Sequence, residues 1–80
     1  MATFVLPGAG FKVCIYDVDH PGPHCHVIYT NEEVTVVNLP SLTVKHGPNL
    51  TRQIKTFLLE NLETLCDEFD KRHPKNKKQP

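Results

Sequence analysis

The chain has 80 residues with nine acidic and nine basic side chains, so it is one small domain without formal net charge at neutral pH. A domain of this size buries only about 60% of the surface that its unfolded chain exposes, and its core is correspondingly thin. No segment approaches the ~20 apolar residues of a membrane span, and the three cysteines lack the spacing of a disulfide scaffold. We therefore expect a cytoplasmic protein with reduced thiols, no signal peptide and no membrane contact.

The charges are distributed unevenly along the chain. Residues 71–80 carry five basic side chains and no acid, which leaves residues 1–70 with a net charge of −5. An acidic body argues against broad contact with a phosphate backbone, which needs a basic face. The basic end can contact nucleic acid or an acidic partner, although its composition is more typical of a solvated, disordered tail. We predict a domain over residues 11–73 and a disordered tail over residues 74–80.

Residues 1–10 are expected to form an irregular lead-in, because Pro7, Gly8 and Gly10 discourage regular structure. Segments rich in β-branched and aromatic residues follow, separated by breaks that contain proline, glycine or asparagine. These segments predict strands over residues 11–18, 24–30, 33–39 and, as a short strand or extended lead, 42–46.

The clearest element is a helix near the C-terminus. Gly47 and Pro48 interrupt the chain, and Asn49 or Thr51 can serve as the N-cap. Apolar residues then recur at helical spacing from Leu50 to Phe69, with acidic residues on or beside the opposite face. Basic residues and then a proline end the helix, so one long helix of about 33 Å is expected.

The order of elements predicts an α+β fold. Strands joined by short turns pair antiparallel, giving a three- to four-stranded sheet covered on one face by the long C-terminal helix. Alternation places Phe11 and Val13 on one face and Cys14 on the other, so both faces of the sheet carry apolar residues. One helix covers only one face. We therefore expect a second copy of the chain to cover the other, giving a homodimer.

Chemistry is concentrated in a short stretch with three histidines, His20, His24 and His26. His24 and His26 are two residues apart on a predicted strand, so both side chains leave the same face. The stiff connection Pro21-Gly22-Pro23 allows His20 to fold back beside them. Cys25 points to the opposite face and is expected in the core, which places the histidines away from the helix or at a sheet edge.

Three interpretations of the histidines remain open. The three rings can bind a divalent metal such as zinc with water as the fourth ligand, and Asp17, Asp19 or His46 can support them. They can instead use their N–H groups to brace the turn and the start of the strand, which is the interpretation we favour. The third interpretation is proton transfer in phosphodiester cleavage, which needs nearby cations such as Lys12. No catalytic residue and no required cofactor can be assigned from the sequence.

Residues 16–27 resemble the signature of a small prokaryotic family, domain of unknown function 4160, which runs approximately D-H-x-P-P-H-F-H-V. The matching positions are His20, Pro23, His24 and His26. Gly22 replaces the first proline of the pair, which loosens the turn, and Cys25 replaces the phenylalanine, which removes an aromatic ring from the core. The resemblance extends over roughly residues 9–73. It implies an accessory protein that is often encoded beside a second small protein in toxin–antitoxin-like pairs.

These observations lead to one main functional hypothesis, a small accessory module of a toxin–antitoxin-like system that acts by binding a partner protein. The partner is expected to be a second small protein encoded nearby. The first alternative is a histidine- or metal-dependent nuclease. The second is a DNA-binding autoregulator that uses the basic tail. We regard an enzyme as the less favoured class.

Overall fold

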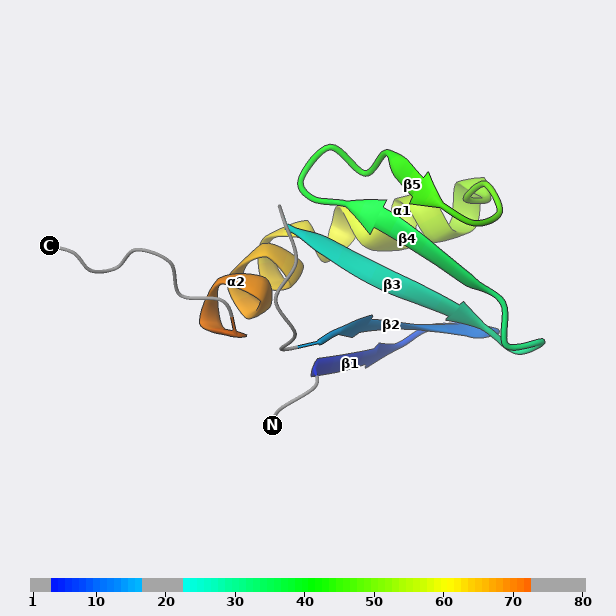
Figure 1. Cartoon of the computed structure of the whole chain (residues 1–80), viewed down its shortest axis with the longest axis horizontal. Coiled ribbons are helices and arrows are strands. Elements are labelled where there is room, and N and C mark those ends of the chain that lie inside the picture. The colour runs from blue at the N-terminus through cyan, green and yellow to red at the C-terminus, as the bar shows by residue number, and fades with distance from the viewer. Residues whose placement is uncertain (1–3, 17–22, 73–80) are drawn as a thin grey trace, which may run out of the picture.

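The computed structural model describes residues 4–16 and 23–72, which form one antiparallel sheet and two helices (Figure 1). The strands lie side by side in chain order, β1-β2-β3-β4-β5. None of the helices in the described ranges is long and apolar enough to cross a bilayer. The elements are β1 (Phe4–Pro7), β2 (Phe11–Ile15), β3 (His24–Tyr29), β4 (Val34–Asn38), β5 (Val44–His46), α1 (Arg52–Glu60) and α2 (Leu62–Arg72).

The predicted α+β class is confirmed, but the predicted number of strands was too low. Strand β1 forms within the expected lead-in, where Phe4 pairs with Ile15 and Pro7 pairs with Lys12. The apolar run before Pro7 suits a strand, and a proline is tolerated at a sheet edge because it removes only a donor. The β1–β2 hairpin is closed by the Gly8 N–H, which donates to the Phe11 carbonyl at 2.8 Å.

The single long helix was also wrong, because the chain breaks it at Asn61. Helix α1 begins after Thr51, whose Oγ1 accepts from the Ile54 N–H at 3.2 Å. It ends where the Asn61 backbone N–H and side-chain Nδ2 both donate to the Phe57 carbonyl, Nδ2 at 2.8 Å. Buried apolar residues continue at helical spacing on both sides of the break. Hydrophobic periodicity alone therefore could not reveal it.

Both helices pack against the same face of the sheet. Alternating residues of β2, β3 and β4 point to this face, as predicted for Phe11, Val13 and Cys25. In Figure 1, α1 lies behind β4 and β5, and α2 lies beside the end of β2 and the start of β3. The buried core consists of Phe11, Val13, Ile15, Cys25, Val27, Val37, Leu39, Leu42, Ile54, Leu58, Leu65 and Phe69.

The opposite face of the sheet, which we call the open face, carries a second set of side chains. Strand register aligns Val5, Cys14, His26 and Val36 in one row across β1 to β4. A neighbouring row is formed by Lys12, Ile28 and Val34. Val5 is 47% exposed and Val34 is 37% exposed, although both are large apolar residues. Within the described residues, both helices lie on the other face, so the open face is a candidate interaction surface.

Candidate functional site

The structure describes two of the three clustered histidines. His24 and His26 open strand β3, and Pro23 precedes them. The Pro23 carbonyl accepts a hydrogen bond from the Leu39 N–H at 2.9 Å, which fastens the entry of β3 to the end of β4. The other predicted site residues of this stretch lie outside the described residues: Asp17, Asp19, His20, Pro21 and Gly22.

The two histidines belong to a row of four aromatic rings. The centroids of His24 and His26 are 5.3 Å apart, at an interplanar angle of 64°. The His26 ring meets Tyr16 at 4.8 Å, and the His24 ring meets Phe69 at 5.7 Å. All three contacts have the edge-to-face geometry that aromatic quadrupoles favour. The row runs from the open face, at the end of β2, to helix α2.

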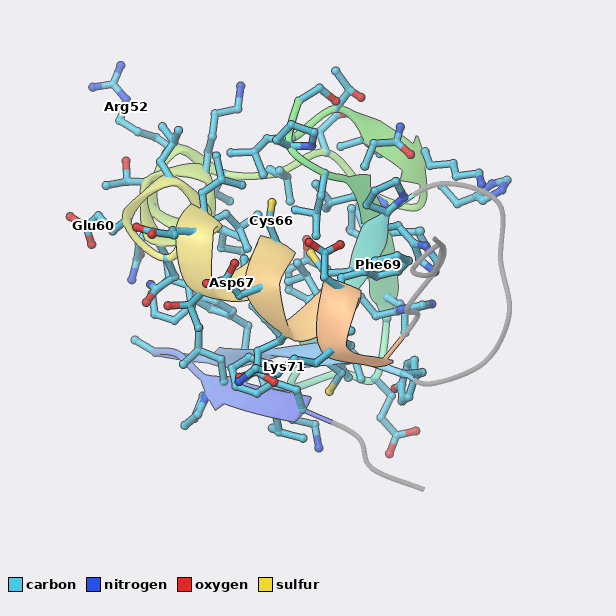
Figure 2. The ribbon with its side chains drawn as sticks, turned by 90° about the vertical axis from the view of Figure 1, so that its left-hand side faces the viewer. Arg52, Glu60, Cys66, Asp67, Phe69 and Lys71 are labelled. Atoms are coloured by element: carbon cyan, nitrogen blue, oxygen red, sulfur yellow. The ribbon has the colours of Figure 1, made fainter. Side chains whose placement is uncertain are left out.

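His24 and His26 have different surroundings. His26 is half-buried on the open face, as predicted, where it pairs with Cys14 and Val36. His24 is only 7% exposed and contacts Phe69 of α2, although alternation gives its side chain the same direction as that of His26. It reaches α2 because it is the first residue of β3, and α2 passes beside the start of that strand (Figure 2). A residue in the first position of a strand can reach an element on either face.

Cys25 is confirmed as a core residue. Cys25 lies between the two histidines in the sequence, but its side chain is fully buried on the opposite face of the sheet. Burial raises the pKa of the Cys25 thiol to about 12, with smaller contributions from Cys66 and Cys14. Since the thiolate is the form that binds metals and attacks electrophiles, Cys25 is held in its unreactive form.

Tyr16 and Phe69 are the two members of the aromatic row that the sequence analysis did not place beside the histidines. Burial raises the pKa of the Tyr16 hydroxyl, and the neighbouring Cys14 raises it further through charge and a hydrogen bond. Tyr16 is two residues after Cys14, so strand alternation puts both side chains on the face that also carries His26. This alternation is the sequence pattern that points to the contact between Tyr16 and His26. Phe69 gave no such signal, because its contact joins residues 45 positions apart in the chain.

The metal interpretation rests on residues that the structure only partly describes. His46 is exposed, and its backbone pairs with Val36, which lies between it and His26 in the sheet. Among the described residues, no group of three His, Cys, Asp or Glu side chains is arranged to hold a metal ion. A metal site that includes His20 therefore stays a prediction.

Chemically, the described part of this cluster can brace the fold and move a proton. His24 is packed against α2, whereas His26 is accessible from the open face. Lys12 lies on the open face one row away from His26, since it pairs with Ile28. The cluster thus combines a structural histidine with a more accessible one.

The sequence of this chain matches one known protein family. The family model described as a domain of unknown function, DUF4160, matches residues 10–70, a range that includes the histidine stretch and all the described elements except β1 and the end of α2. No curated protein and no solved structure matches the chain significantly. The match covers most of the chain, so the chain belongs to the DUF4160 family.

Proposed function

We propose that the protein is a homodimeric, protein-binding accessory module of a toxin–antitoxin-like system. The observation that carries the proposal is the open face, an apolar sheet surface that lies opposite both helices. Exposed apolar surface of this kind is typical of interaction sites. The partnership with a second small protein encoded nearby rests on the resemblance of the signature stretch described above.

A second copy of the chain suits the open face because of its charge. Strands β1 to β4 contain one charged residue, Lys12, and no acid. A nearly neutral apolar surface can meet itself across a two-fold axis without like-charge repulsion. The helical side of the molecule is more highly charged, because residues 52–72 contain five acids and four bases. The nearly uncharged sheet face is therefore the better surface for self-association.

Two matched substitutions test this arrangement. Val34→Glu places a charge on the open face, and Leu59→Glu places the same charge on an exposed apolar position of α1, where Leu59 is 57% exposed. Light scattering of purified protein at roughly 100 μM should give a dimer for the wild type and for Leu59→Glu and a monomer for Val34→Glu, because burying an unpaired carboxylate is costly. A monomeric wild type would refute the dimer.

Binding of the partner is tested separately by co-expression. The wild-type chain and the product of the adjacent gene should co-purify at a fixed ratio through two columns. If the two proteins separate although each is folded by circular dichroism, the accessory-module proposal fails.

A histidine-dependent nuclease is the second candidate, and the observation in its favour is the pair His24–His26 with Lys12 on the open face. One imidazole as base and another as acid could cleave a phosphodiester beside a cation. Purified wild type should then cleave RNA or DNA, and His26→Ala should lose the activity while staying folded. Elemental analysis of protein made without a His-tag shows whether a metal is bound. Absence of cleavage with and without added zinc would remove this candidate.

A further inference from the structure

A second surface lies on the helical side of the molecule, at a groove between α1 and the turn that joins β1 to β2. The groove has a volume of about 720 Å³. Its apolar floor is formed by Ala9, Phe11 and Phe57. Its polar rim is formed by residues of α1, namely Arg52, Gln53, Thr56 and Glu60.

The floor of the groove is fixed by packing. The rings of Phe11 and Phe57 meet edge to face, with centroids 5.1 Å apart and an interplanar angle of 90°. Phe11 is only 7% exposed, and its ring lies over Gly8, where a side chain would collide with it. A floor held in this way needs little reordering when an apolar side chain binds, which lowers the entropic cost of binding.

The surroundings of the groove are acidic at one end. Glu60 stands on the rim at the end of α1, and Glu63 follows three residues later on an exposed position of α2. Figure 2 shows Arg52 and Glu60 projecting outward from α1. The two are eight residues apart, so about 12 Å of helix separates a cationic end of the groove from an anionic end.

We propose that this groove binds a basic amphipathic segment of a partner protein. The apolar side chains of that segment pack on Phe11 and Phe57, and its lysines or arginines contact Glu60 and Glu63. Arg52 repels cations from the other end and thereby sets the direction of the segment. The inference rests on the proposed function, because it specifies the chemistry of the partner that the module would bind.

Shape and sequence disfavour other occupants. A two-fold interface places identical surfaces against each other, so a second copy would bring groove against groove and leave the apolar floor unfilled. The chain's own basic end has the required charge, but residues 73–80 contain no large apolar side chain to fill the floor. A partner segment that has both basic and large apolar side chains matches the acidic end and the apolar floor of the groove.

The test uses the full-length chain and a fluorescein-labelled helical peptide of about 16 residues, roughly 24 Å long. The peptide carries two leucines four residues apart, flanked by arginines. Fluorescence anisotropy should show saturable binding. Replacing the leucines by serine, or the arginines by glutamate, should weaken binding at least about tenfold, which corresponds to about 1.4 kcal/mol.

Charge reversal in the protein provides the matched control. The double variant Glu60→Lys with Glu63→Lys should weaken binding of the arginine peptide at least about tenfold, and the neutral Glu60→Gln variant less. Glu33→Lys makes the same reversal at an exposed position of the β3–β4 turn and should leave binding within about twofold of wild type. Circular dichroism and urea midpoints establish that each variant is folded.

The remaining outcomes count against the groove or against the proposed function. Equal binding of the serine peptide would show simple charge attraction, and unchanged binding to the double variant would place the peptide elsewhere. Tighter binding after removal of residues 73–80 would show that the chain's own end occupies the groove, and loss of the dimer in the double variant would indicate a second copy. A complex with the neighbouring gene product that survives the double substitution would overturn the groove but not the proposed function. Peptide binding without any complex with the neighbouring gene product would overturn the proposed function but not the groove.

Discussion

The ring of His24 lies 5.7 Å from the ring of Phe69, at an angle of 61°, and this contact joins the start of β3 to α2. It makes one histidine of the signature stretch part of the packing between sheet and helix. The favoured interpretation, in which the ring N–H groups brace the turn and the start of the strand, stays a prediction, because the contact with Phe69 is a ring contact. His26 has more solvent exposure and a different set of neighbours, so the two should respond differently to substitution.

His24→Ala should lower the free energy of unfolding by about 2 kcal/mol, because it removes a buried ring and leaves a cavity beside Phe69. His26→Ala should cost less than about 1 kcal/mol, since His26 is only half-buried. Urea denaturation followed by circular dichroism measures both. Equal losses would contradict the structural difference between the two residues.

A buried hydroxyl connects the sheet to the loop before α1. Thr35 is fully buried, and its hydroxyl donates to the Pro48 carbonyl at 2.7 Å. A hydroxyl has one proton, so in the 2.9 Å contact between Thr35 and Tyr29 the tyrosine is the donor. Thr35→Val keeps the shape but leaves the Pro48 carbonyl and the Tyr29 hydroxyl without this partner.

We expect Thr35→Val to destabilise the fold by about 1–3 kcal/mol, because it removes two part-buried hydrogen bonds that each contribute about 0.5–1.5 kcal/mol. Tyr29→Phe removes only the outer bond, so it should cost less than about 1 kcal/mol. Thermal melts of both variants beside wild type measure the difference. A larger loss for Tyr29→Phe would show that the Tyr29–Thr35 hydrogen bond stabilises the fold more than the Thr35–Pro48 hydrogen bond does.

Stability at alkaline pH should depend on Cys25. Its thiol has a pKa of about 12 in the folded chain, against an ordinary value of 9.0. Below pH 9 the thiol is protonated in both the folded and the unfolded chain, so its titration does not lower the free energy of unfolding. As the pH rises from about 9 towards 12, the unfolded chain loses this proton while the folded chain keeps it, so the free energy of unfolding falls.

The comparison with Cys25→Ala isolates this effect, because the other groups titrate in both proteins. Between pH 8 and pH 10.5, wild type should lose more of its free energy of unfolding than the variant loses. Urea unfolding at the two pH values measures the losses. Parallel losses would mean that the folded thiol titrates in its ordinary range.

Two glycines with positive φ provide a matched test of local packing. Gly47 has a φ of 96°, and a Cβ there would collide with the Val34 carbonyl and the Thr35 Cα. Gly10 has a φ of 84°, but a Cβ there would meet no atom within 4 Å. Gly10→Ala should cost about 1 kcal/mol for the backbone conformation alone.

Gly47→Ala should cost clearly more, about 2–4 kcal/mol, because strand β4 would also have to move away from β5. Urea midpoints of the two variants make the comparison. Similar costs would contradict the close approach of Gly47 to the backbone of β4.

Much of this protein could be predicted from short-range patterns in its sequence. Alternation along β2 and β3 placed Val13 and Cys25 in the core and His26 on the other face, because side chains of a strand alternate regardless of context. Spacing of apolar residues located the helical segment, and Thr51 was among the expected caps. The signature stretch indicated the family to which the chain belongs.

Other features depend on contacts between residues distant in sequence, and only the tertiary structure decided them. Strand β1 forms because its backbone finds partners on β2, and the helix ends at Asn61 through a hydrogen bond that periodicity does not encode. The contact of His24 with Phe69 and the groove over Phe11 and Phe57 both require a helix to be packed against the sheet. Local sequence fixes which way a side chain leaves its own strand, but only packing decides which side chain of another element it meets.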